Sequence, residues 1–74
     1  MDRISIDPEI CNGKPHIKNT RIMVKNILGM LAGGYDINRI LIEYPELSLE
    51  DISSALNYAA VILNEEKIIF KEAV

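Results

Sequence analysis

The sequence predicts a mainly α fold, in which a short extended β element precedes a three-helix helix-turn-helix core of the winged-helix or homeodomain-like kind. Three observations predict this fold. Apolar residues recur at helical spacing in three stretches after residue 23. The second and third stretches are joined by only three or four residues, as in a helix-turn-helix motif. Residues 1–23 instead alternate apolar and polar side chains between turn signals.

The N-terminal arm, residues 1–23, is expected to form two or three very short strands. The alternation of Ile4-Ser5-Ile6 stops at Asp7-Pro8, which is typical of a turn. Asn12-Gly13 is a second turn signal, since both residues tolerate positive φ. Pro15 to Lys18 alternates again. Strands this short form only against the helices or against a second copy.

The first two helices are expected at about residues 24–32 and 37–44. The first follows from apolar residues at i, i+3, i+4 and i+7, beginning at Val24, and Gly33-Gly34 closes it with a left-handed C-terminal residue. The second has Asp36 as its N-cap and ends before Pro45.

The third and longest helix is expected at about residues 49–66, after a capping box formed by Ser48 and Asp51. Its apolar residues form two neighbouring stripes. One stripe holds Leu49, Ile52, Leu56, Ala59 and Leu63, and the other holds Ala55, Tyr58 and Ile62. Residues 67–74 form an apolar tail, and the whole chain, 1–74, is read as a single domain.

Size and composition limit the sources of stability. The chain has 74 residues, one cysteine (Cys11) and one histidine (His16), so neither a disulfide nor a structural zinc site is expected. Because so short a chain buries only ~60% of its unfolded surface, association with another chain is the remaining source of stability, and a homodimer or a partner complex is expected. No signal peptide or membrane-length apolar run is present, which predicts a cytoplasmic protein without membrane contact.

Residues suited to catalysis are scarce. His16 has no acidic neighbour in sequence and no second histidine with which to build a relay, and Cys11 is better explained as a small half-buried residue. The Asn12-Gly13-Lys14-Pro15 run lacks the pattern of a phosphate-binding loop, and the pairs Glu50-Asp51 and Glu65-Glu66 are interpreted as solvated helix faces. We expect no enzyme activity, catalytic residue, small-molecule substrate, cofactor or metal.

Charge is distributed unevenly along the chain. The net charge of −3 argues against a nucleic-acid partner, yet no acidic residue lies between Ile10 and Tyr35, where four of the eight basic residues fall. If DNA is bound, the candidate contacts are Lys14, His16, Lys18, Asn19, Thr20, Arg21 and Lys25. Acidic residues at Glu46, Glu50 and Asp51 oppose DNA at the start of the third helix, where such motifs read bases.

The run from Ile6 to Val24, IDPEICNGKPHIKNTRIMV, resembles the signature of the bacterial and archaeal "domain of unknown function 433" family. The stretches 31–34, 44–52 and 55–59 resemble later parts of the same family, so the resemblance covers about residues 4–63. It implies a helix-turn-helix-like fold. Because family members often look like VapB-type antitoxins, it also implies a protein that neutralises a nuclease-like toxin of PIN-like fold and, with it, represses its own operon.

The chain departs from the family pattern at three positions. Asn12 and Asn19 stand where the family usually has glycine, and Met23 stands where it has proline. Asparagine is the non-glycine residue most at ease in the left-handed region, so both turns are expected to survive. The motif residues Thr20 and Arg21 are intact, and a structural role in holding the arm onto the helices is an alternative to a binding role.

Two functions of different classes follow. The first is an antitoxin-like, dimeric protein that contacts double-stranded DNA through residues 14–25 and a toxin through its tail, at Ile68, Ile69 and Phe70. The second is a protein–protein interaction adaptor of helix-turn-helix fold with no nucleic-acid role. The acidic start of the third helix favours the second, and the basic segment favours the first.

Overall fold

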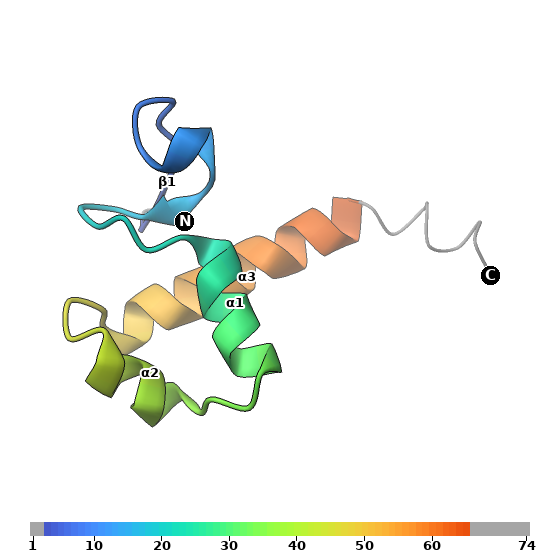
Figure 1. Cartoon of the computed structure of the whole chain (residues 1–74). Coiled ribbons are helices and arrows are strands. Elements are labelled where there is room, and N and C mark those ends of the chain that lie inside the picture. The colour runs from blue at the N-terminus through green and yellow to red at the C-terminus, as the bar shows by residue number, and fades with distance from the viewer. Residues whose placement is uncertain (1–2, 66–74) are drawn as a thin grey trace.

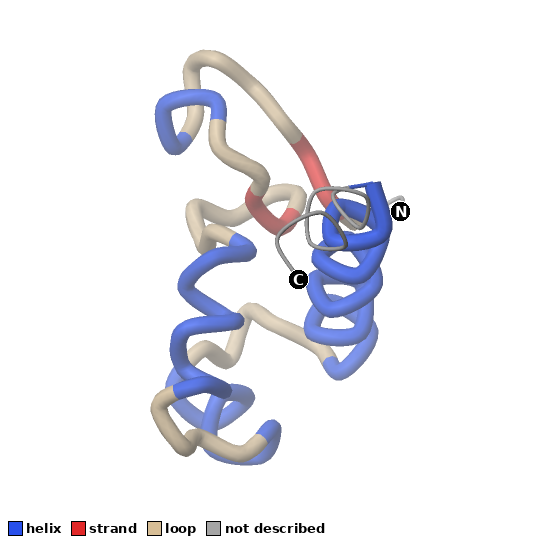
Figure 2. Tube along the Cα trace, turned by 90° about the vertical axis from the view of Figure 1, so that its right-hand side faces the viewer, coloured by secondary structure: helices blue, strands red, loops and turns tan. Residues whose placement is uncertain are grey.

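The computed structural model describes residues 3–65, which form a short two-stranded sheet and three α-helices. The strands are β1 (Ile4–Ser5) and β2 (His16–Ile17), and the helices are α1 (Val24–Ala32), α2 (Ile37–Glu43) and α3 (Leu49–Glu65). Figure 1 shows the arm above the helices, with α1 crossing α3 and α2 beside the start of α3. Figure 2 shows the same layers from the side. The predicted fold class is confirmed, and the three expected helices are found within a residue or so of their predicted bounds.

The arm is held by a short antiparallel ladder and two left-handed turns. Ile4 pairs with Ile17 and Ser5 pairs with His16. Between the strands, a 3-10 turn at Cys11–Gly13 has positive φ throughout, including 55° at Asn12, and Asn19 lies at 63° after β2. Asn12 and Asn19, which stand where the resembled family usually has glycine, therefore adopt the left-handed conformation, as predicted.

Local signals account for the bounds of α1 and α2. Gly34, at φ 101°, closes α1. There the amides of Gly34 and Tyr35 donate to the carbonyls of Leu31 and Met30, which is the Schellman arrangement. At the start of α2 the Asp36 carboxylate accepts the Arg39 amide proton at 2.8 Å.

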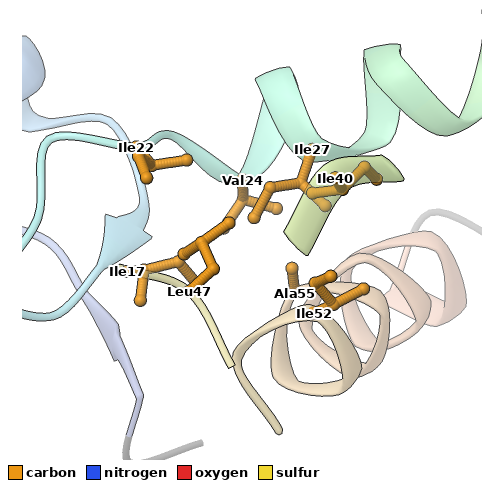
Figure 3. Close-up of a cluster of buried hydrophobic side chains, with 8 residues drawn as sticks. All are labelled: Ile17, Ile22, Val24, Ile27, Ile40, Leu47, Ile52 and Ala55. Atoms are coloured by element: carbon orange, nitrogen blue, oxygen red, sulfur yellow. The ribbon is translucent and has the colours of Figure 1, made fainter. Parts of the chain in front are cut away.

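The core comprises eight buried apolar residues from the arm, all three helices and the α2–α3 turn, and their side chains converge in Figure 3. They are Ile17, Ile22, Val24, Ile27, Ile40, Leu47, Ile52 and Ala55. No aromatic side chain is among them, although Tyr35, Tyr44 and Tyr58 pack against the cluster. The core is thus aliphatic, as the composition predicts.

The two apolar stripes of α3 differ in burial. Ile52 and Ala55 are fully buried, whereas Leu49, Leu56 and Leu63 are exposed. The stripe with the three leucines therefore lies beside the core-facing side of α3, and only Ile52 from that stripe enters the core. Sequence periodicity identifies both stripes but not which one meets α1 and α2.

Candidate nucleic-acid interface

A tight turn after β2 presents the central part of the basic segment. The Thr20 hydroxyl donates to the Ile17 carbonyl at 2.8 Å and accepts the Ile22 amide proton at 3.0 Å. The Ile17 amide donates to the Ile22 carbonyl at 3.0 Å, which closes the turn. Lys18, Asn19 and Arg21 are exposed on this turn, which we call the basic turn (residues 18–21).

The basic turn lies beside the helix-turn-helix connection. Lys18, Asn19, Thr20 and Arg21 line a polar groove together with Glu46, which belongs to the turn between α2 and α3. Ser5, Asp7, Ile10 and His16 complete the lining from the arm. A cationic turn therefore lies next to the α2–α3 turn, just before the helix whose start enters the major groove in helix-turn-helix proteins. The carboxylates of Asp7 and Glu46 weaken the positive potential of the groove.

The remaining basic candidates lie elsewhere. Lys14 and Lys25 are exposed and line a second groove, between α1 and the C-terminal half of α3. The structure thus divides the predicted set into two groups, with Lys18, Asn19, Thr20 and Arg21 in one and Lys14 and Lys25 in the other. Residues that follow one another in the arm diverge because β2 and the turn after it reverse the chain direction.

Two of the residues predicted to contact DNA instead interact with other parts of the domain. His16 is only 1% exposed, and its Nδ1 atom lies 3.3 Å from the Lys14 carbonyl oxygen. The His16 ring is therefore too shielded from solvent for the DNA contact predicted for it, because both residues of β2 are buried. Thr20 is half-buried and uses its hydroxyl within the turn, which supports the structural interpretation of this residue.

The start of α3 contains an ion pair that sequence reasoning missed. Ser48 and Asp51 form the predicted capping box, in which the Ser48 amide donates to Asp51 Oδ2 at 2.9 Å and the Asp51 amide donates to Ser48 Oγ at 3.2 Å. The other carboxylate oxygen, Oδ1, accepts a hydrogen bond from the Arg3 guanidinium at 3.0 Å. Asp51 is buried, so the prediction of a solvated Glu50-Asp51 face holds for Glu50 alone.

The ionisation of Asp51 reflects this setting. Burial by itself raises the pKa of the Asp51 carboxyl, but the hydrogen bonds from Ser48 and Arg3, with the positive charge of Arg3, outweigh burial, so the pKa is lowered. Asp51 is thus a carboxylate whose charge is already compensated by Arg3. Of the three acids expected to repel DNA near the start of α3, Glu46 and Glu50 remain exposed and unpaired in the described chain.

Other predicted features are placed as follows. Cys11 is half-buried, as expected, with its Sγ 3.4 Å from the Arg21 carbonyl oxygen. Ile68, Ile69 and Phe70, the predicted partner-binding residues, lie outside residues 3–65 and thus outside the described structure. Within the described residues, no group of three or more potential ligands is placed to hold a metal ion, and no helix has the length and apolarity needed to cross a membrane.

The fold and the basic turn together define a small helix-turn-helix domain with an extended N-terminal arm. The chain belongs to the family described as "Protein of unknown function (DUF433)", which matches residues 4–59. The crystal structure of a DUF433 member protein from Anabaena variabilis ATCC 29413 superposes with a TM-score of 0.79 at 34% identity, covering 100% of this chain and 71% of that one.

A curated relative, the "Uncharacterized protein y4eO" of Sinorhizobium fredii (strain NBRC 101917 / NGR234), is 32% identical over 56 residues. The match covers 76% of this chain but only 25% of that protein, so the chain spans about a quarter of the length of this relative.

Proposed function

We propose that this DUF433 protein is an antitoxin-like binding protein that contacts double-stranded DNA as a dimer and neutralises a PIN-like nuclease toxin. The observation that carries the DNA part is the position of the basic turn beside the α2–α3 turn, where Lys18 and Arg21 are exposed. In this arrangement the start of α3 enters the major groove, and the basic turn lies against the adjacent phosphates.

The proposal assigns different roles to the two elements. Lys18 and Arg21 supply phosphate contacts, which position the protein without reading sequence. Base reading falls to the exposed polar residues of α3, Ser53 and Asn57. The compensation of Asp51 by Arg3 supports the proposal because it removes one of the negative charges at the start of this helix.

The toxin part rests on the family resemblance and on the apolar residues 68–70. A variant that lacks residues 68–74 is expected to lose toxin neutralisation. Co-purification of the tagged protein from its native host, with bound protein and DNA both identified, is the direct test. A nuclease-like partner together with a fragment from upstream of the protein's own gene is the expected result.

The second candidate is a protein–protein adaptor with no nucleic-acid role. Two observations favour it: Glu46 lies in the same groove as the basic turn, and Glu50 is exposed in the first turn of α3. Recovery of a protein partner without DNA would support the adaptor and overturn the DNA part.

A binding titration with matched variants tests the DNA part. Fluorescence anisotropy of a labelled duplex from upstream of the gene is measured at several salt concentrations for the wild type, Lys18→Ala, Arg21→Ala and Lys25→Ala. Each of the first two variants is expected to reduce the slope of log affinity against log salt by about 1.8, because a dimer loses one phosphate contact from each of its two copies. Lys25→Ala removes the same charge from the other groove and is expected to leave the slope unchanged.

Two results would contradict the assignment. Equal losses in all three variants would show that overall charge alone drives binding. An affinity that does not depend on salt, or no binding at all, would remove DNA from the function.

A further inference from the structure

An apolar groove of about 370 Å³ lies between α1 and the C-terminal half of α3. Figure 1 shows that this half of α3 extends past α1. Lys14 and Lys25 are the charged residues in its lining. The apolar side chains that the two helices contribute are Val24, Leu28, Tyr58, Ala59, Ile62 and Leu63.

The groove lies at one end of the hydrophobic core, and core residues form part of its lining. Val24 belongs to the buried cluster, and Leu28 and Tyr58 pack against it. α3 has 17 residues and is about 25 Å long, whereas α1 has nine residues and crosses α3 instead of running along it. α1 therefore covers only part of the core-facing side of α3. Burial falls accordingly along this side, from fully buried Ile52 and Ala55 to half-buried Tyr58 and Ile62.

We propose that this groove binds the C-terminal half of α3 from a second copy of the chain, with the two helices antiparallel about a two-fold axis. A two-fold interface must be self-complementary, since the same surface is used on both sides. α3 meets this condition because it forms one wall of its own groove and presents an uncovered apolar ridge to the groove of the other copy. Ala59 lies at the centre of this ridge, where its small side chain allows the two helices to approach closely.

The charges of the groove and of the proposed occupant are complementary. Lys14 and Lys25 make the groove basic, whereas the C-terminal half of α3 contains one acidic residue, Glu65, and no basic residue. The C-terminal end of a helix is also the negative end of its dipole. A second α3 therefore brings negative charge to a basic groove.

The chain's own residues 66–74 are a less suitable occupant. The described structure ends at Glu65, two residues after Leu63. To enter the groove of its own chain, the following segment would have to reverse direction at once, yet Glu66 to Val74 contains no glycine, proline, asparagine, aspartate or serine, the residues that favour turns. The second copy supplies the dimer interface of the proposed function, but the inference rests on the groove alone and is tested without DNA, so either proposal can fail separately.

Two leucines on α3 provide a matched test of the interface. Leu63 and Leu49 are 54% and 52% exposed, but only Leu63 lines the groove. Sedimentation equilibrium of the wild type is expected to give twice the chain mass of 8.3 kDa. Leu63→Glu is expected to weaken dimerisation at least about tenfold, because it places a carboxylate in an apolar contact. Leu49→Glu is expected to leave the dimer intact, and circular dichroism checks that both variants keep their helices.

Cysteine crosslinking tests the two-fold geometry directly, because a residue next to the axis meets its own copy. In a Cys11→Ser background, Ala59→Cys is expected to form an intermolecular disulfide on mild oxidation, whereas Ser53→Cys, an exposed site on α3 outside the groove lining, is not. A monomeric wild type would overturn the proposal, as would a dimer that Leu63→Glu leaves intact. If a monomeric wild type binds less of a hydrophobic dye than a variant truncated after Glu65, the chain's own residues 66–74 fill the groove instead.

Discussion

Replacement of Asp51 by alanine removes two interactions from the start of α3. The Ser48 amide loses its acceptor at 2.9 Å, and Arg3 loses its ion-pair partner at 3.0 Å. The other half of the capping box survives, because it uses the backbone amide of residue 51. The lost half of the cap is worth about 1 kcal/mol.

The Arg3 side chain is 47% exposed, so the ion pair adds only about 0.2–1 kcal/mol. Loss of a negative charge from the first helical turn adds roughly 0.3–1 kcal/mol. The total cost is therefore expected to be about 2 kcal/mol. At roughly 4–8 °C per kcal/mol for a domain of this size, Tm falls by roughly 8–16 °C.

Urea unfolding followed by circular dichroism, at one fixed protein concentration, measures this loss. Glu50→Ala is the matched control, because Glu50 is an exposed carboxylate in the same helical turn and contributes to the helix dipole alone. It is expected to cost less than about 1 kcal/mol.

The pH dependence of stability gives an independent check. Since the pKa of Asp51 is lowered on folding, its carboxylate stabilises the fold above the unfolded pKa of about 3.9, and this contribution is lost as pH falls through the folded value. The difference in unfolding free energy between the wild type and Asp51→Ala should therefore shrink below about pH 4. Equal costs for the Asp51 and Glu50 variants, or a difference that does not change with pH, would refute this account.

Four further substitutions have definite expected outcomes. In thermal melts, Gly29→Ala should stabilise the protein by about 0.5–1 kcal/mol, since an added Cβ on this helical residue meets nothing within 4 Å. Gly34→Ala should instead destabilise the protein by about 1–2 kcal/mol, because the φ of Gly34 is 101°. Ile27→Ala, at a fully buried site, should cost about 2–5 kcal/mol, and circular dichroism at 25 °C should show substantial unfolding. Thr20→Val should cost about 1–3 kcal/mol in urea unfolding by leaving the Ile22 amide without its acceptor; an unchanged midpoint would contradict the structural role of this hydroxyl.

The helices could be predicted from the sequence because their signals are local. Asp36 caps α2 within three residues, and Ser48 with Asp51 caps α3 in the same way. The positive φ at Asn12 and Asn19 is likewise a property of a short turn. Each of these features depends on residues within one turn of each other, so the local sequence is enough to predict it.

The features that sequence reasoning missed depend on residues far apart in the chain. The partner of Asp51 is Arg3, 48 positions away, and no spacing rule links the two. The burial of His16 depends on how the arm lies on the helices. Lys14 and Lys25 lie apart from the basic turn because of the path that the chain takes through β2 and into α1. Neither the alternation of apolar and polar residues nor the distribution of charge along the sequence determines this path.

The contact between Arg3 and Asp51 also bears on the order in which the molecule assembles. Neighbouring helices meet across short connections, whereas docking of the arm on α3 closes a loop of 48 residues. Closing a longer loop costs more chain entropy. We expect the helices to associate first and the arm to dock last. During synthesis on the ribosome, the N-terminal arm would therefore dock only after the start of α3 has emerged.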